Sequence, residues 1–211
     1  MDGTATPRRA ASAGIFAQCR GFVMSNKAAA KVMVIGTRWL GAEVLKQLHE
    51  RSLTLALIAV KSDDQAARTA EKLGLPCRVK PDAVPLMATD FPWRPDLIVC
   101  AHSFRIVEPW VINWASLGAI GYHPSLLPAF KGRRAVQDAL DAGQRITGGS
   151  VYWLTEAIDG GPVVVAGGRR LQDQVQVLPN ETAGELWRRA LAPLGAGLLT
   201  EGVISICQTD G

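Results

Sequence analysis

The chain has 211 residues, of which 48% are hydrophobic and 20% are charged. This balance is typical of a globular protein and excludes a long disordered, collagen-like or coiled-coil chain. The formal net charge of +4 would suit a nucleic-acid or membrane-surface partner. Most of that excess lies in residues 1–30, which hold four basic residues and a single acidic one. Because the remainder is almost neutral, the charge argues against nucleic acid as a partner.

The four cysteines, Cys19, Cys77, Cys100 and Cys207, are far apart and form no cluster at metal-ligand spacing. We therefore expect no disulfide scaffold and no metal, and a reduced, cytoplasmic location. Charged residues, Gly or Pro interrupt every hydrophobic stretch before it reaches the roughly 20 residues of a membrane-spanning helix. We expect a soluble protein without a membrane partner.

Residues 1–30 are rich in Ala and Ser, poor in acidic residues and without clear periodicity. We interpret them as a disordered tail that precedes a catalytic domain at 31–211. An organelle transit segment has a similar composition. A start at Met24 is a further alternative, since an ordinary beginning follows it.

From residue 31 onward, short apolar stretches alternate with segments in which apolar residues recur at helical spacing. The pattern predicts strands at 31–36, 53–60, 77–79, 95–100 and 117–123, and helices at 37–51, 63–74 and 108–116. This alternation predicts an α/β fold, a Rossmann-like, mostly parallel twisted sheet with helices on both faces. Ligands of such sheets bind at the carboxyl ends of the strands, so we expect the chemistry after Gly36, Cys100 and Tyr122.

The second half of the chain predicts a helix at 132–143, a strand at 150–154, a turn at 156–162 and a strand at 163–171. A glycine pair in the last strand suggests a bulge. Thr182 and Glu185 form a capping box that opens a helix reaching residue 206. We expect Pro193 to kink or split that helix.

The turn from Gly36 to Gly41 has glycines for a tight strand-to-helix connection. It does not match GxGxxG, and it lacks the Lys-Ser/Thr of a P-loop. Val60 and Lys61 also stand where a nicotinamide-binding sheet would carry an acidic residue. The sequence therefore favours a plain tight turn over dinucleotide binding.

The most specific motif reads Gly-Tyr-His-Pro-Ser-Leu-Leu-Pro at 121–128, and an Asp-Gly turn begins at Asp159, 36 residues after His123. These residues resemble the folate-dependent formyltransferase family, which includes phosphoribosylglycinamide formyltransferase, the amino-terminal domain of methionyl-tRNA formyltransferase and the hydrolase domain of formyltetrahydrofolate dehydrogenase. The resemblance runs from about Lys31 to about Leu199. It implies the formyltransferase fold and 10-formyltetrahydrofolate as formyl donor, with no metal.

His123 and Asp159 suit acyl transfer. An amine that attacks a formyl carbon creates an oxyanion and releases a proton, so the site needs a hydrogen-bond donor and a base. His123 can be the donor and Asp159 the base. Taken alone, a structural histidine and a turn aspartate would explain the same residues. The resemblance implies the catalytic roles, with Asp159 also positioning His123.

Gly121 departs from the family pattern. Family members that formylate amines usually carry Asn two residues before the histidine, where its amide helps to bind the formyl oxygen. The resemblance to the hydrolase domain, which also lacks that Asn, keeps hydrolysis of 10-formyltetrahydrofolate open as an alternative. A folate-binding protein that has lost catalysis is a third reading.

The segment after the fourth strand is similar to the family segment that binds the pterin ring. An ordinary apolar core would explain the same residues. The resemblance implies folate contacts for Phe104, Arg105, Ile106, Val107, Leu127, Thr155, Glu156 and Ile158. Flat aromatic ligands prefer apolar walls with a few polar groups, which this mixture supplies. We expect His102 to be a wall of the pocket.

The candidate acceptor-binding residues are Gly36, Thr37, Arg38, Lys131 and Arg133. Basic residues fit poorly at the start of a helix, so a bound anion near Lys131 and Arg133 would relieve the repulsion. We expect the acceptor to be an unidentified small-molecule amine. Phosphoribosylglycinamide fits poorly, because the family's phosphate-binding turn is replaced at 36–39. The chain ends soon after the catalytic domain, which argues against tRNA as the acceptor. Formation of a homodimer is left open.

Overall fold

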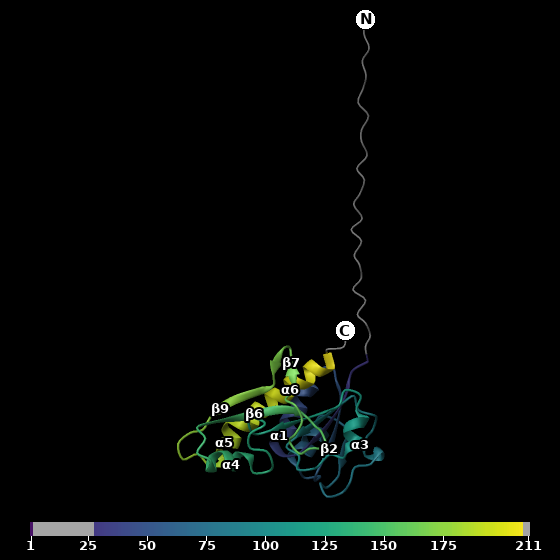
Figure 1. Ribbon diagram of the computed structural model, residues 1–211. Helices are drawn as coiled ribbons and strands as arrows, with labels where there is room; N and C mark the ends of the chain where they lie inside the picture. Colours follow the sequence, from purple (N-terminus) through teal and green to yellow (C-terminus); the bar gives the residue numbers. More distant parts are fainter. Residues whose placement is uncertain (2–27, 209–211) are drawn as a thin grey trace.

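The computed structural model describes residue 1 and residues 28–208 (Figure 1). The tail expected at 1–30 therefore lies almost entirely outside the described residues. The first half of the domain comprises β1 (Lys31–Gly36), α1 (Arg38–His49), β2 (Thr54–Ala59), α2 (Gln65–Lys72), β3 (Cys77–Val79), β4 (Leu97–Ala101), α3 (Pro109–Trp114) and β5 (Ala119–His123). These bounds follow the expected alternation of strands and helices.

The second half comprises α4 (Ala135–Asp141), β6 (Ile146–Trp153), β7 (Val165–Ala166), β8 (Arg169–Arg170), β9 (Gln172–Gln176), α5 (Ala183–Leu186), a π-helical segment (Trp187–Leu191) and α6 (Ala192–Gln208). Seven strands form one sheet in the order β3-β2-β1-β4-β5-β6-β9. The first five are parallel, β6 runs antiparallel to β5, and β9 antiparallel to β6. The predicted α/β fold is confirmed.

The sheet buries both of its faces, which explains the continuous apolar runs of its central strands. In β1, Val32 and Val34 point to a core built with α1, α2 and α6. Met33 and Ile35 point to a second core that includes α3 and the segment around Phe91. Figure 1 shows α3 at one end of the molecule and α4, α5 and β9 at the other.

Two glycines allow close packing where β1 ends and α1 begins. A Cβ on Gly36 would lie 2.8 Å from the carbonyl oxygen of Ala101, and one on Gly41 would lie 2.9 Å from the carbonyl carbon of Gly36. The strand order switches here, because β1 has β2 on one side and β4 on the other. Such a switch point opens a crevice at the carboxyl ends of the strands.

Buried polar groups fix the segment between β3 and β4. Arg105 donates hydrogen bonds to the carbonyl oxygens of Val84 (2.7 Å) and Pro81 (2.6 Å). The fully buried carboxylate of Asp90 lies 2.9 Å from Nζ of Lys80. Although burial opposes ionisation, this hydrogen bond from Lys80 and further bonds hold the pKa of Asp90 below its usual range. Arg105 thus attaches the segment between β3 and β4 to the residues that follow β4.

Two local features differ from the expectations. Gly167 and Gly168 have positive φ angles and connect β7 to β8 as a hairpin turn, so the predicted bulge is wrong. The strand β9 was not predicted, because its sequence QDQVQ is polar. Just before Pro193 the π-helical segment interrupts the α-helix, in keeping with the expected break, and the helix resumes as α6.

One helical segment of the described part, Ala183–Gln208, is long and apolar enough to cross a membrane by length and composition alone. Pro193, Gly195 and Glu201 lie inside this segment, so its apolar residues are interrupted as the sequence led us to expect. Half of its most apolar window is buried inside the fold. Because α6 packs against β4, β5 and β6, the apolar residues serve the core of the domain.

The ring of Tyr122 lies between β6 and α6, and its hydroxyl donates a 2.7 Å hydrogen bond to the carbonyl oxygen of Leu191. A Cβ on Gly195 would lie 2.6 Å from this ring, and a Cβ on Gly149 would also collide with it. Both glycines therefore make room for the tyrosine that precedes His123.

We expect Gly195→Ala to lower the free energy of unfolding by about 1–3 kcal/mol, because the added methyl group overpacks against Tyr122. Gly197→Ala in the same helix is the matched control, since a Cβ there meets no atom within 4 Å. Its higher helix propensity should stabilise the protein by up to about 1 kcal/mol. Denaturant unfolding of both variants checks this, and equal effects would contradict it.

Candidate active site

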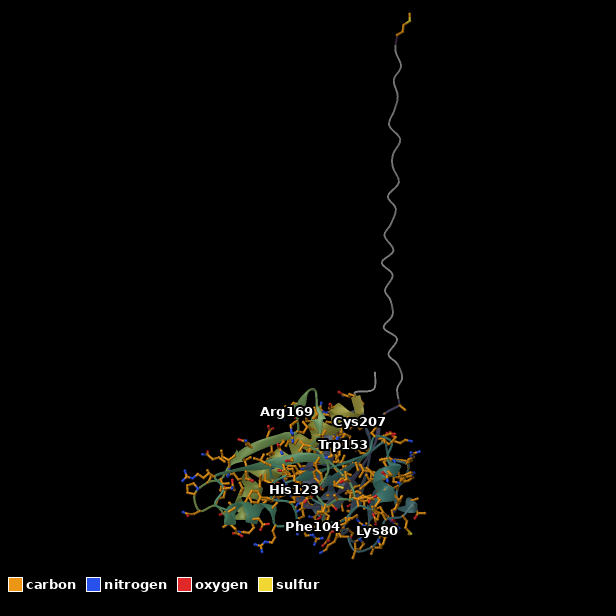
Figure 2. The ribbon with its side chains drawn as sticks, viewed as in Figure 1. Lys80, Phe104, His123, Trp153, Arg169 and Cys207 are labelled. Atoms are coloured by element: carbon orange, nitrogen blue, oxygen red, sulfur yellow. The ribbon has the colours of Figure 1, made fainter. Side chains whose placement is uncertain are left out.

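A cavity of about 560 Å³ lies at the carboxyl ends of β4 and β5, and the last residues of β6 and the segment that follows them also line it. Its walls include most of the residues that the sequence singled out: His123, Asp159, Phe104, Arg105, Ile106, Val107, Thr155, Glu156, Ile158 and Arg133. Figure 2 shows His123 in the middle of the domain and Phe104 nearer its edge, away from Arg169 and Cys207. The fold thus brings two segments, 103–107 and 155–159, to one cavity.

Five candidates do not line this cavity: Gly36, Thr37, Arg38, Leu127 and Lys131. Leu127 is buried, and its backbone groups bond to Ser150 and Gln172. The polar groups of Thr37 and Arg38 face Asp64, as described below. The folate role of Leu127 and the acceptor roles of the other four stay predictions.

His123 ends β5 and is 6% exposed. Its Nε2 lies 2.7 Å from the carbonyl oxygen of Phe130. A carbonyl oxygen can only accept, so its hydrogen bond assigns a proton to Nε2. Nδ1 lies 3.4 Å from Oδ2 of Asp159. This separation exceeds that of a good hydrogen bond, so Nδ1 is the ring nitrogen that remains available to bind a substrate.

Asp159 is held by two hydrogen bonds. Its Oδ1 accepts from the hydroxyl of Tyr152 at 2.7 Å, and its Oδ2 accepts from the backbone N–H of Gly132 at 2.8 Å. A carboxylate has about four lone-pair sites, so capacity remains to accept a proton. Its side chain is 11% exposed, which leaves one edge open to the cavity.

One short loop therefore fixes both members of the pair. The carbonyl of Phe130 binds the His123 ring, and the amide of Gly132 binds the Asp159 carboxylate. Phe130 and Asp159 have left-handed φ angles of 50° and 47°. Such conformations are costly for residues other than glycine and persist where the surroundings enforce them, commonly at functional sites.

Tyr152 and Trp187 are cavity residues that the sequence did not single out. Burial, and then the hydrogen bond to Asp159, raise the pKa of Tyr152 well above its usual range, so its hydroxyl remains a donor. Trp187 reaches the cavity from the π-helical segment. Burial also raises the pKa of the Cys100 thiol to about 12, so it stays protonated and is a poor nucleophile.

His102 is a wall of the cavity, as expected. Its ring packs edge-to-face with Trp187 (4.9 Å between centroids) and Phe104 (5.5 Å). Burial, assisted by the positive charge of Arg38, lowers the pKa of His102 from 6.5 to about 4. The imidazole is therefore neutral at pH 7, and this part of the cavity is aromatic and uncharged.

The carboxylate of Asp64 binds the amino-terminal end of α1. Asp64 accepts hydrogen bonds from the hydroxyl of Thr37 (2.6 Å) and from the N–H groups of Arg38 (2.9 Å) and Ala66 (2.8 Å). Although burial opposes ionisation, these hydrogen bonds hold the pKa of Asp64 below its usual range. The amide that α1 would offer to a bound anion is thus already used.

The His102 environment predicts a pH-dependent stability. Between pH 6.5 and 4 the unfolded chain binds a proton at His102 that the folded protein excludes. This contribution to stability is complete above pH 6.5 and is lost as the pH falls through 4. In His102→Asn, which tolerates the φ of 58° and does not titrate, the fall in Tm over this range should be smaller. Equal slopes in both proteins would contradict the expectation.

Comparison with known proteins identifies the family. Residues 88–200 match the family described as formyl transferase. The chain is 27% identical over 175 residues to methionyl-tRNA formyltransferase of Thermotoga neapolitana, covering 76% of this chain and 54% of that protein. It is 30% identical over 190 residues to cytosolic 10-formyltetrahydrofolate dehydrogenase of Xenopus laevis, covering 84% of this chain and 20% of that protein.

The chain thus spans about half the length of the first relative and a fifth of the second. Among solved structures, phosphoribosylglycinamide formyltransferase of Anaplasma phagocytophilum matches with a TM-score of 0.74 and 26% identity, covering 85% of this chain and 88% of that one. The enzyme of the same name from Bacillus halodurans, 20% identical with a TM-score of 0.69, shares the fold. Sequence and structure agree that the chain belongs to the formyl transferase family.

Proposed function

We propose that the protein transfers a formyl group from 10-formyltetrahydrofolate to the amine of a small-molecule acceptor. The observation that carries this proposal is the pairing of His123 with Asp159, 3.4 Å apart, in the wall of the cavity at the strand ends. A donor for an oxyanion and a base for an amine proton are the two groups that acyl transfer requires.

In the proposed reaction the amine nitrogen attacks the formyl carbon. A carbon–nitrogen bond forms, and the electron pair of the carbonyl π bond moves to oxygen. This oxygen accepts a hydrogen bond from Nδ1–H of His123 in its doubly protonated form, in which Nε2–H stays bonded to the carbonyl oxygen of Phe130. Asp159 accepts the proton that the attacking nitrogen loses. Collapse of the intermediate restores the carbonyl and breaks the bond to N10 of the folate, which takes up the proton that Asp159 accepted.

The composition of the cavity supports a folate donor. Phe104, Ile106 and Ile158 line it, with 41%, 69% and 65% of their surface exposed. Exposed apolar side chains around a few polar groups suit a flat ring. The Arg133 guanidinium lies 5.6 Å from the centroid of the Phe104 ring and donates to the Phe104 carbonyl oxygen at 3.0 Å. A cation so placed suits the anionic tail of the same ligand.

The start of α1 indicates whether the acceptor carries a phosphate group. Because the Asp64 carboxylate accepts the hydrogen bond of the Arg38 N–H, a phosphate at this turn would meet a negative charge in place of that donor. This supports an acceptor without phosphate at that position. An amine carried on tRNA, as the name of the methionyl-tRNA relatives would suggest, is the competing outcome of an acceptor screen.

Hydrolysis of 10-formyltetrahydrofolate is the second candidate. Gly121 leaves no side-chain amide beside His123, and a dehydrogenase of 10-formyltetrahydrofolate is among the relatives. Incubation with the donor alone distinguishes the two. Steady release of formate without an amine supports hydrolysis, release only with an amine supports transfer, and donor binding without turnover in either case contradicts both.

We expect Asp159→Asn to lower kcat by about 100- to 10,000-fold, because the variant cannot take the amine proton. Asn tolerates the left-handed φ at this position, so the fold should be retained. Steady-state kinetics check kcat, and quenching of tryptophan fluorescence checks that the donor still binds. Turnover equal to that of the wild type would contradict the role of Asp159.

We expect Arg133→Ala to raise the KM for the donor about tenfold, because a charge-assisted contact to an anionic ligand is lost. The salt dependence of KM should weaken at the same time. Arg134→Ala is the matched control, since this side chain is 71% exposed, faces Asp138 and does not line the cavity. Equal effects of the two variants would show that Arg133 has no specific role.

A further inference from the structure

Gly121 and Tyr152 lie directly opposite each other in the antiparallel pair of β5 and β6. A Cβ on Gly121 would lie 3.4 Å from Cε1 of Tyr152 and 3.3 Å from Cδ2 of Leu154. A Cβ at position 121 would thus touch the Tyr152 ring and require the Leu154 side chain to move by a few tenths of an ångström. Gly121 therefore leaves room for the Tyr152 ring to pack against the backbone of β5.

The hydroxyl of Tyr152 ends on the Asp159 carboxylate. The Oη to Oδ1 distance is 2.7 Å, and both residues line the cavity that contains His123. The Tyr152 ring lies edge-to-face with the His123 ring, with 6.5 Å between centroids. Tyr152 and Gly132 donate to different oxygens of this carboxylate.

Two donors on two oxygens fix the rotation of the carboxylate. With Tyr152 on Oδ1 and Gly132 on Oδ2, the second oxygen is kept 3.4 Å from Nδ1 of His123. Without the Tyr152 hydroxyl, the Gly132 amide would be the one remaining hydrogen bond among those found in the described structure, and the carboxylate could turn about its Cβ–Cγ bond. The geometry of the His123–Asp159 pair then loses one of its two restraints.

We propose that Tyr152 is a positioning residue for formyl transfer, which holds the Asp159 carboxylate in register with His123 in a site where position 121 supplies no polar side chain. This inference rests on the proposed function. Tyr152 acts through Asp159, which is the group that meets the amine proton. The hydroxyl therefore affects turnover more than donor binding.

The other tyrosine of the chain provides a contrast. Tyr122 precedes His123, but its hydroxyl donates to the carbonyl oxygen of Leu191 and so attaches β5 to the helical segment. Burial raises the pKa of Tyr122 above its usual range, with no carboxylate involved. One tyrosine hydroxyl thus connects secondary-structure elements, and the other restrains a reacting side chain.

The kinetic test is Tyr152→Phe, which keeps the ring against Gly121 and removes the hydroxyl alone. We expect kcat to fall about 10- to 100-fold, because small displacements of a catalytic group are costly, while KM for the donor changes less than twofold. A carboxylate that loses a hydrogen-bond donor binds protons more readily, so the acid limb of the kcat profile should move to higher pH. A purely structural role would lower Tm without this shift.

The second test does not depend on activity. The chain has two tyrosines, so protein labelled with ¹³C at the tyrosine Cζ gives two NMR signals. Tyr152→Phe and Tyr122→Phe each remove one signal and so assign both. We expect Asp159→Asn to move the Tyr152 signal and to leave the Tyr122 signal in place.

The outcomes separate the two proposals. An unchanged Tyr152 signal in Asp159→Asn, or an unchanged kcat in Tyr152→Phe, overturns the positioning role while wild-type turnover supports the proposed function. If the wild type turns over neither with water nor with any amine, the proposed function fails, and the role of Tyr152 in it fails too. The NMR signals then still report whether the hydroxyl is bonded to Asp159.

Discussion

The site depends on one loop, whose backbone groups bind two side chains from different parts of the chain. His123 comes from the end of β5 and Asp159 from the turn after β6, and the segment 130–132 holds both through a carbonyl and an amide. Main-chain groups of an ordered loop have few alternative positions, so they restrain the pair more tightly than long side chains would. The strained backbone at Phe130 is consistent with a loop whose conformation is set by these contacts.

Electrostatics divide the cavity into two regions. The reacting pair is an imidazole and a carboxylate, and the phenol of Tyr152 donates a hydrogen bond to the carboxylate. Near His102 and Trp187 the wall is aromatic, and its histidine is neutral at pH 7. The carboxylate of Asp64, which does not line the cavity, accepts a hydrogen bond from the N–H of Arg38 at the start of α1. The net positive charge of the whole sequence therefore says little about the ligand, because the local arrangement of charges determines what the cavity can bind.

The sequence predicts most of the sheet but less of the site. Parallel strands buried on both faces are continuous apolar runs, which is why β1, β2, β4 and β5 are recognisable. The strand β9 is a polar edge strand and carries no such signal. The spacing of His123 and Asp159 identifies the candidate pair, because it resembles a family motif.

The roles of Tyr152 and Asp64 could not be predicted from a motif or from alternation of apolar residues. The contact of Tyr152 with Gly121 depends on the register of an antiparallel pair, which alternation alone does not define. Asp64 caps α2 locally, but its bond to Arg38 joins residues 26 positions apart. A local capping signal was present at Asp64, since it precedes a helix, yet nothing in it reveals the second helix that it also serves.

The π-helical segment also determines how this cavity can change. A π turn contains one residue more than an α turn, so it is equivalent to a one-residue insertion in the helical run Ala183–Gln208. Removing one residue there would restore a regular α-helix and leave the residues before the segment in phase with α6, because the wide turn absorbs the extra residue. The helical run can therefore gain or lose one residue at this point while Trp187 and α6 keep their neighbours, a kind of change that comparing side chains position by position would not reveal.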